Sequence, residues 1–389
     1  MKSIQPSFSK SGSKQTIQPS WARPINGVRA GYQNFEWNTD SSPSAPILFP
    51  DPNAFAIQDF NVDFHHFSVY GYHNWQMGDS FALNLGLNYD DLHQPANVAT
   101  APFSTEKKNE AQISPKIGFI WTPTANATFR AAYTRSLSGF INGQSYRLEP
   151  TAVAGFNQSF RSLVPESVAG DTSGSQFDTF NISLEQKFNT GTYFGLSGEI
   201  LYSKTRNVAG AFIYNGDQVG TIAFPTYTRG FNQAMDYRER SLIFTVDQLL
   251  GRQWSASARY RLSQANLDLN YVDIDPANLL VADFPARQNL NSVLHHLNLH
   301  ANWNHPSGLF SIFEGNWYHQ DNSGFSPAEP GNDFWQFNTY AGYRFWHRRA
   351  ELTAGLLNVT GQNYRLESLN LYNETARSRT LFARLRISF

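Results

Sequence analysis

The sequence predicts an all-β protein: a transmembrane, antiparallel, up-and-down β-barrel of about fourteen strands, with sixteen as the alternative count. Three observations predict this fold class. Apolar and polar residues alternate over long segments, as they do in a strand with one apolar and one polar face. Short and long connections alternate between these segments, and aromatic residues gather near segment ends. Both features are typical of bacterial outer-membrane barrels.

The alternation is clearest in SFALNLGLNYDD, residues 80–91. Its large apolar side chains all share one parity: Phe81, Leu83, Leu85, Leu87 and Tyr89. The positions between them hold small or polar residues, so one face of this strand is apolar and the other is polar. The same pattern recurs in 252–268, 291–304, 333–346 and 377–389.

Reading the alternating segments in chain order gives fourteen strands. They are expected at residues 27–37, 61–76, 80–90, 111–122, 126–137, 174–188, 191–205, 236–249, 252–268, 291–304, 307–320, 333–346, 349–367 and 377–389. Each is at least eleven residues long, which is enough for the roughly 9–11 residues that a tilted strand needs to cross a bilayer.

The connections alternate in length along the chain. The short ones are 77–79, 122–126, 189–192, 250–252, 305–308 and 347–349. The long ones are 37–60, 91–110, 138–173, 206–235, 269–290 and 321–332. Outer-membrane barrels place short turns in the periplasm and long loops outside. We therefore expect a polar periplasmic segment or linker over 1–26, and a barrel over 27–389 whose long connections are extracellular.

A soluble β-sandwich or propeller would also alternate, but three features favour lipid around the apolar face. The strands exceed the usual length of about 5–6 residues in soluble sheets. Aromatic residues lie near strand ends, as in interfacial girdles: Trp75, Trp121, Trp254, Trp303, Trp335, Phe345 and Trp346. The opposite face carries cations suited to a watery lumen: Lys116, Arg130, Arg259, Arg261, Arg344, Arg384 and Arg386. Leu83, Leu85 and Leu87 are thus expected to contact acyl chains.

Composition excludes several other classes of protein. The mean hydropathy of −0.44 conceals the alternation, and no apolar run approaches the roughly 18 residues of a spanning helix. The net charge of −1 indicates no nucleic-acid partner. The chain has no cysteine, and its first residues lack the apolar core of a signal peptide.

Four segments resemble the barrel of TonB-dependent receptors. They are FSVYGYHNWQMGDSFALNLGLNYDD (67–91), ISPKIGFIWTPTANATFRAAYTRSLS (113–138), GLLNVTGQNYRLE (355–367) and RTLFARLRISF (379–389). The third matches loosely the pattern of the family's penultimate strand, through Asn358 to Tyr364. The fourth matches its closing strand, whose terminal Phe389 is the expected barrel-assembly signal.

The resemblance implies a 22-stranded barrel, an N-terminal plug and an energy-coupling box. Residues 1–26 are too few and too polar to form that plug. We therefore expect either a segment of a 22-strand barrel or a smaller complete barrel related to it. Energised import through this chain alone is not expected.

The resemblance implies transport or permeation of solutes across a bacterial outer membrane. The alternative is the barrel portion of a larger export or structural assembly, such as polysaccharide export with periplasmic helical repeats. Expected partners are outer-membrane lipids and lipopolysaccharide, the barrel-assembly machinery, and an energy-coupling or periplasmic protein. No G-x-S-x-G motif or catalytic set stands out, so neither enzymatic activity nor a cofactor is expected.

The arginines of the polar face are the candidates for contact with solute: Arg130, Arg259, Arg261, Arg344, Arg384 and Arg386. Residues two apart on a strand share a face at about 6.5–7 Å, so such arginines form a cationic wall that attracts anions. The alternative is pairing with Glu185, Glu199 or Glu351 on nearby strands.

The long connection 138–173 holds the candidate loop ligands Tyr146, Arg147, Phe156, Phe160 and Arg161. The segment folds inward to constrict the pore, caps it outside, or packs as a surface loop. Helical spacing in PTAVAGFNQSFRSL (150–163) predicts a short helix. The histidine pairs His65–His66 and His295–His296 point to opposite faces, and His300 lies too far along the strand from His296, so no metal site is expected.

Overall fold

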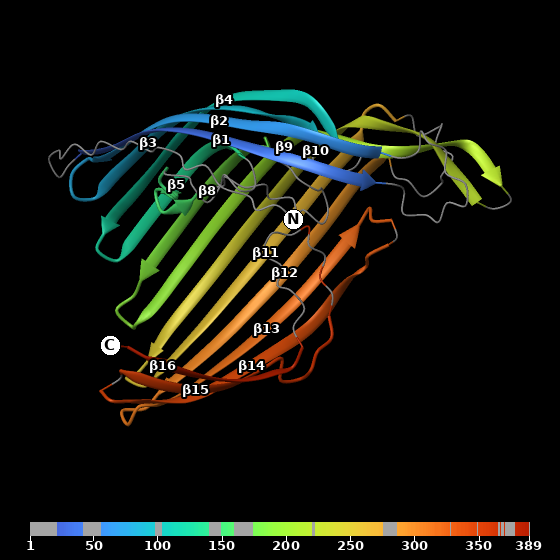
Figure 1. Cartoon of the computed structure of the whole chain (residues 1–389). Coiled ribbons are helices and arrows are strands. Elements are labelled where there is room, and N and C mark those ends of the chain that lie inside the picture. The colour runs from blue at the N-terminus through green and yellow to red at the C-terminus, as the bar shows by residue number, and fades with distance from the viewer. Residues whose placement is uncertain are drawn as a thin grey trace.

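The computed structural model describes residues 22–41, 56–97, 103–139, 149–158, 174–219, 222–274, 286–326, 328–347, 349–364, 366, 369 and 378–388. Fourteen antiparallel strands form one sheet in chain order, and β6 with β7 forms a separate two-stranded hairpin (Figure 1). No helix among these residues is long and apolar enough to cross a membrane. The all-β, up-and-down prediction is confirmed.

The strands of the large sheet follow the predicted ones in order. They are β1 (Ala22–Ser41), β2 (Ala56–Gln76), β3 (Phe81–Asn97), β4 (Ser104–Thr124), β5 (Ala127–Leu137), β8 (Gln176–Lys187), β9 (Thr192–Val219), β10 (Ile222–Leu250), β11 (Trp254–Tyr271), β12 (Arg287–Asn304), β13 (Leu309–Ser323), β14 (Gly331–Phe345), β15 (Ala350–Leu357) and β16 (Thr380–Ile387). The hairpin strands are β6 (Ala152–Val153) and β7 (Phe156–Asn157).

Several strands differ in length from expectation. Strand β1 begins within the predicted N-terminal segment 1–26, β1 and β2 extend into the predicted loop 37–60, and β3 and β4 extend into the predicted loop 91–110. Strands β9 and β10 pair well into 206–235, which was expected to be a loop, because continued pairing satisfies their backbone hydrogen bonds. Strand β15 ends at Leu357, ten residues before the predicted end at 367. Asn358 has a φ of 49°, and its side chain bonds both the N–H and the C=O of Gln362 at 2.8 Å. This local turn closes the strand.

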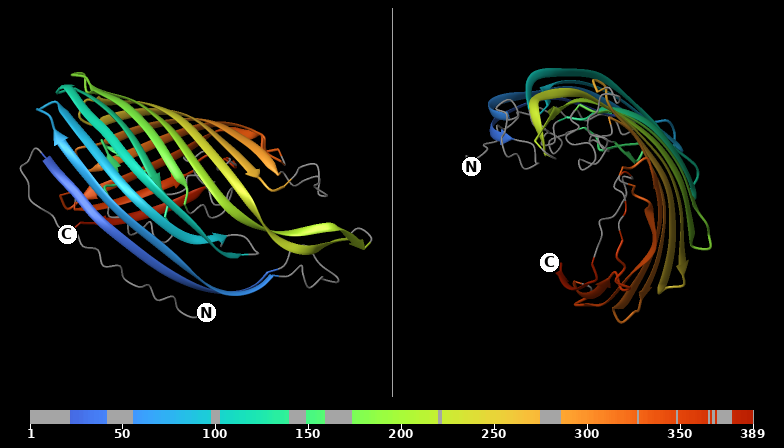
Figure 2. Two further views of the ribbon diagram at one scale, coloured as in Figure 1. Left: turned by 90° about the horizontal axis from the view of Figure 1, so that it is seen from above. Right: turned by 90° about the vertical axis from the view of Figure 1, so that its right-hand side faces the viewer.

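The sheet curves into an open arc (Figure 2). Strands β1 and β16 form its two edges, and within the described residues they pair only with β2 and β15. Closure of this sheet into a cylinder therefore stays a prediction, as does the exact number of strands in the complete barrel.

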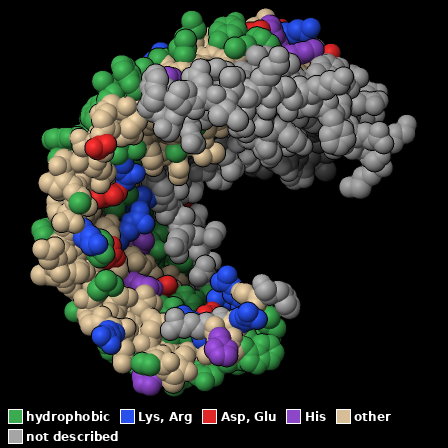
Figure 3. Space-filling view, turned by 90° about the vertical axis from the view of Figure 1, so that its left-hand side faces the viewer, with side chains coloured by type: hydrophobic (Ala, Val, Ile, Leu, Met, Phe, Trp, Pro, Cys, Tyr) green, Lys and Arg blue, Asp and Glu red, His purple; other side chains and the backbone are tan. Residues whose placement is uncertain are grey.

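The two faces of the arc differ in chemistry. The convex face exposes large apolar side chains on successive strands, including Leu87 (55 % exposed), Ile113 (61 %) and Ile182 (50 %). Charged and histidine side chains gather on the concave face, while apolar ones line the outer rim (Figure 3). This division follows directly from the two-residue period of the sequence.

Aromatic side chains mark one border of the apolar face. Trp75, Trp121, Trp254 and Trp346 are exposed beside the short turns. The Trp254 ring lies 6.2 Å from that of Trp303 on the neighbouring strand. Because tryptophan favours the boundary between hydrocarbon and water, these residues are placed as an interfacial girdle would require.

Candidate functional site

The hairpin β6–β7 lies against the concave face of the sheet. The helix predicted for 150–163 is wrong where the structure describes it, over 150–158, because this segment turns back on itself. Ala154 and Gly155 have φ values of 49° and 83°, which is the backbone of a two-residue hairpin turn and is incompatible with a helix. Of the three expected arrangements, folding inward is the one seen for this part of the long connection.

The hairpin fits a gap in the side chains of the sheet wall. Val153 and Ala154 are buried against Tyr72 and Ala132. A Cβ added to Gly118 would lie 2.8 Å from the Ala154 Cβ, so the glycine leaves the space that the turn fills.

A buried ion pair anchors the hairpin to the sheet. The Glu149 carboxylate lies 3.2 Å from Lys116 Nζ, and both side chains are almost fully buried. Tyr72 Oη donates to Glu149 Oε2 at 2.8 Å, and Asn88 Nδ2 donates to Oε1 at 3.0 Å. These hydrogen bonds satisfy the carboxylate, which is the condition under which a buried ion pair is tolerated.

Further buried polar residues extend this network along the wall. Asn88 Nδ2 also donates to Asp90 at 2.8 Å, and Ser68 Oγ donates to Asn88 Oδ1 at 3.0 Å. His66 Nε2 lies 3.0 Å from Asp90 Oδ1, with both side chains buried. The polar parity of strands β2 and β3 thus forms a hydrogen-bonded surface beside the hairpin.

A second segment packs onto the concave face after β15. The Tyr364 ring stacks on Phe334 at 4.3 Å between centroids. Leu369 is fully buried, and its carbonyl accepts a hydrogen bond from Tyr237 Oη at 2.9 Å. The hairpin and the segment after β15, which are far apart in the sequence, therefore both pack against the concave face.

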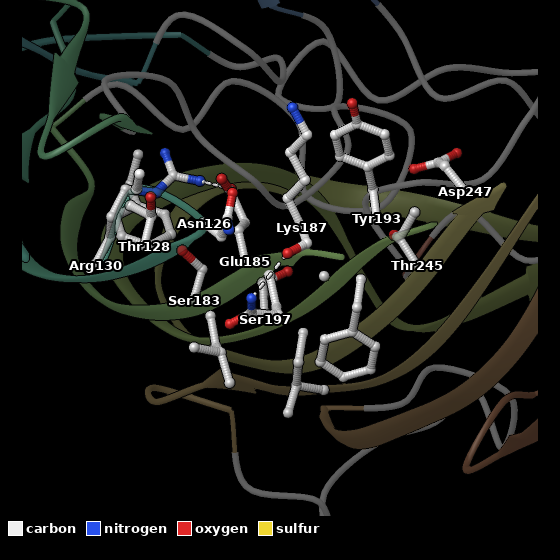
Figure 4. Close-up of a pocket in the computed structure, with 17 residues that line it drawn as sticks. Asn126, Thr128, Arg130, Ser183, Glu185, Lys187, Tyr193, Ser197, Thr245 and Asp247 are labelled. Carbon is white, nitrogen blue, oxygen red and sulfur yellow. Dashed lines mark hydrogen bonds and ion pairs between the residues drawn. The ribbon is translucent and has the colours of Figure 1, made fainter. Parts of the chain in front are cut away.

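A pocket of about 490 Å³ opens on the concave face beside the hairpin (Figure 4). Strands β5, β8, β9 and β10 provide its wall, and Phe156 of the hairpin borders it. Its polar lining includes Asn126, Thr128, Arg130, Ser183, Glu185, Lys187, Tyr193, Ser197, Thr245 and Asp247.

Charges of both signs face this pocket. Arg130 forms an ion pair with Glu185, and its guanidinium lies 5.3 Å from the centre of the Phe156 ring. Lys187 Nζ lies 5.6 Å from the centre of the Tyr193 ring. Together with the hydroxyls, these groups offer hydrogen bonds, charge and aromatic contact to a polar solute.

The six predicted arginines all occupy the polar parity, but they lie in three separate places. Arg130 borders the pocket. Arg259 and Arg261 share one face of β11, where Arg261 is only 8 % exposed. Arg344 and Arg384 contact Glu351 at 2.9 and 3.5 Å. Arg386 lies opposite Glu351 in the register of β15 and β16. The alternative of pairing with Glu185 and Glu351 is thus observed for three of the six.

Of the five loop candidates, only Phe156 is described, and it borders the pocket. Tyr146, Arg147, Phe160 and Arg161 lie outside the described residues. So do Phe389 and residues 1–21 of the expected N-terminal segment. The roles expected for these residues stay predictions.

The predicted opposition of the histidine pairs is seen in the register. His66 is buried on the polar face, whereas His65 pairs with His93 on the other parity. The His296 ring stacks on Tyr318, with 4.3 Å between ring centroids. His295 instead lies on the apolar face, where it contacts Tyr260 and Trp317. In the ranges that the structure describes, no group of three or more acidic or histidine side chains could hold a metal ion.

Sequence reasoning missed several residues of this site, including Tyr72, Asn88, Glu149, Lys187 and Asp247. The parity rule already places four of them on the polar face. Glu149 carries no such signal, because it lies in an irregular connection. The burial of its partner Lys116, which requires a carboxylate nearby, is known only from the structure.

Comparisons with known proteins agree with this architecture. A family model described as TonB dependent receptor-like, beta-barrel, matches residues 6–373. Among solved structures, the copper transporter OprC is similar with 14 % identity and a TM-score of 0.58, over 96 % of this chain and 55 % of that one. No curated protein sequence matches significantly.

Two further solved structures are similar. The FrpB iron transporter from Neisseria meningitidis (F3-3 variant) has 14 % identity and a TM-score of 0.56, over 96 % of this chain and 53 % of that one. The ferric-catecholate import receptor Fiu from E. coli K12 has 15 % identity and a TM-score of 0.52, over 98 % and 53 %. At these identities the likeness concerns the fold, and the chain spans about half the length of each structure.

Proposed function

This chain belongs to the TonB-dependent receptor-like β-barrel family, and we propose that it forms the wall of an outer-membrane barrel through which polar solutes pass. Proteins of this family are bacterial outer-membrane barrels. The concave face would border the solute path, and the convex face would contact lipid. The assembly machinery and an energy-coupling or periplasmic protein are the proposed partners.

The opposed chemistry of the two faces carries this proposal. Leu87 and Ile113 are more than half exposed on the convex face, which is unfavourable in water but favourable against acyl chains. The concave face has ion pairs and hydroxyl groups that need water or polar partners. A sheet with this division suits a membrane on one side and an aqueous path on the other.

The pocket beside the hairpin supports a polar organic solute, because its two cations, Arg130 and Lys187, are balanced by the carboxylates of Glu185 and Asp247. Arg130 and Lys187 supply cations, and the rings of Phe156 and Tyr193 supply stacking surface. The similar structures are named for copper, iron and ferric catecholate. Of these, a ferric catecholate has the aromatic character that the rings of this lining would accept.

Flux through reconstituted protein tests the proposal. The full chain, refolded into planar bilayers, should give currents with anion preference. Arg259→Gln should move the reversal potential toward cation selectivity, because an exposed cation of the concave face is removed. Bilayers that contain inserted protein yet stay silent would contradict permeation and favour a closed or assembly-dependent barrel, as in export systems.

A further inference from the structure

The convex face carries an apolar hollow of about 670 Å³ across β5, β8, β9 and β10. Its walls are large side chains that are themselves exposed, among them Phe180 (48 %), Ile182 (50 %) and Leu242 (48 %). Ile117 and Ile200 border it as well. The hollow therefore lies on the face that the proposed function assigns to lipid.

Small residues create the hollow. Small and large side chains alternate across four adjacent strands in the sheet register, in the order Ala131, Ile182, Gly198 and Leu242. A Cβ added to Gly198 would meet only the Ile182 side chain within 3.5 Å. The small side chains of Ala131 and Gly198 thus lie between larger ones, and we call the hollow at this row the furrow.

Two arginines lie where the furrow meets the polar part of the convex face. Arg240 borders the hollow itself, and Arg238 follows two residues away on the same face, at about 6.5–7 Å. Both side chains are exposed. The Arg238 guanidinium lies 5.0 Å from the centre of the Tyr202 ring. Among the described residues, no ion pair joins either arginine.

Three acidic groups lie nearby, and each has a partner. Asp236, two residues from Arg238 on the same face, accepts from Arg206 Nη2 at 3.1 Å on both carboxylate oxygens, and Asp268 accepts a hydrogen bond from Asn289. Asp178 pairs with Arg135, whose Nε and Nη2 donate to the two carboxylate oxygens at 2.8 and 3.1 Å. Tyr133 Oη donates to the same carboxylate at 2.5 Å. Arg238 and Arg240, with Lys204 on the neighbouring strand, therefore present net positive charge beside an apolar furrow.

An apolar furrow that ends at a pair of exposed guanidinium groups suits an anionic amphiphile. We propose that this site binds a membrane lipid with a phosphorylated head group, namely the lipid A part of lipopolysaccharide. An acyl chain would occupy the furrow, and Arg238 with Arg240 would bind a phosphate through the paired N–H groups of each guanidinium. The arginines lie toward the long connections, where the outer leaflet is expected. The inference rests on the membrane placement of the convex face, and not on flux.

Lipid binding by the full chain in uncharged detergent tests the proposal. The chain would be titrated with bisphosphorylated lipid A, with dephosphorylated lipid A and with phosphatidylglycerol, and bound lipid would be counted by native mass spectrometry. We expect bisphosphorylated lipid A to bind at least tenfold more tightly than the dephosphorylated form. Raising the salt concentration should weaken this preference. Equal retention of the two forms, or tighter binding of phosphatidylglycerol, would overturn the assignment.

Three variants locate the site. Arg238→Gln with Arg240→Gln should reduce lipid A binding about tenfold, and Gly198→Leu should reduce it by filling the furrow. Arg287→Gln removes another exposed arginine beyond the apolar band, on β12, and should leave binding unchanged. Circular dichroism and heat-modifiable gel mobility would verify folding of each variant. Unchanged binding in both the charge and the furrow variants would refute the site, even where the same preparations conduct ions.

Discussion

At the scale of single residues, the direction of each side chain decides its environment. Leu85 lies in the middle of the apolar face of β3 and is 39 % exposed. The neighbouring positions Asn84 and Gly86 face the hairpin and the concave wall. One residue along the strand thus separates hydrocarbon from a polar interior.

Leu85→Arg should impair membrane insertion. A cation on the lipid face near the bilayer midplane costs about 2–4 kcal/mol, so the folded fraction in vesicles at intermediate urea should fall. Gel mobility after refolding measures that fraction. Ser257→Arg, which places the same side chain on the concave parity of β11, is the matched control. If both variants refold equally well, the assignment of the convex face to lipid is wrong.

The pair Lys116–Glu149 should be the most sensitive polar contact of the hairpin. Glu149→Gln leaves the ammonium of Lys116 buried without its counter-charge, which typically costs about 3–5 kcal/mol. We expect the hairpin to detach, so that proteases cleave within 149–158 at least tenfold faster. Adding Lys116→Met should restore much of the protection. Equal cleavage rates in the wild-type chain and in Glu149→Gln would show that the ion pair does not hold the hairpin.

At the scale of elements, the hairpin β6–β7 depends on the shape of the wall behind it. The hairpin packs directly on Gly118. A Cβ at this position would lie 2.9 Å from Val153 Cγ1, in addition to its contact with Ala154. In the sheet itself, a Cβ at Gly118 would lie 3.2 Å from the Ala131 carbonyl oxygen of β5, so a shift of a few tenths of an ångström would accommodate it.

Gly118→Val should therefore displace the hairpin while leaving the sheet intact. Overpacking of this kind costs about 1–3 kcal/mol, and hydrogen exchange of the amides in 149–158 should accelerate accordingly. Gly195→Val is the control, because a Cβ at Gly195 meets only Thr245 at 3.7 Å. Similar exchange in both variants would contradict the close fit seen at Gly118.

At the scale of the whole molecule, the two edge strands of the open arc, β1 and β16, each have one side without a neighbouring strand among the described residues. Unpaired strand edges cannot face hydrocarbon, because their N–H and C=O groups would lose hydrogen bonds there. Strands β1 and β16 must therefore pair in the membrane, either with each other or with additional strands.

The chain has no cysteine, so a cross-link can be introduced cleanly. Val28→Cys and Ala383→Cys place thiols on β1 and β16. If the chain forms the smaller complete barrel, the first of the two expected alternatives to test, a short bis-maleimide in vesicles should join the thiols within one chain and give a faster-migrating monomer. Cross-links between copies only, or none, would contradict a barrel closed by this chain alone.

Much of the fold could be predicted from the sequence, because period-two patterning is a local property. The fourteen strands follow in order, and Lys116 and the six arginines fall on the polar parity as expected. The candidate site was harder to predict from the sequence. Neither the pairing of Glu149 with Lys116 nor the inward hairpin leaves a local signal, and the helical spacing in 150–163 misled because it ignored the turn at Ala154–Gly155.

The sequence by itself determined which face of each strand is apolar, since alternate side chains must point to opposite sides of a pleated sheet. Only the tertiary structure decided which distant segments meet on the concave face: the hairpin on Gly118, Leu369 beside Tyr237, and the lining of the pocket. The physical reason is that parity is fixed by bonds between neighbouring residues. Docking depends on gaps and charges contributed by strands that come together only when the sheet curves.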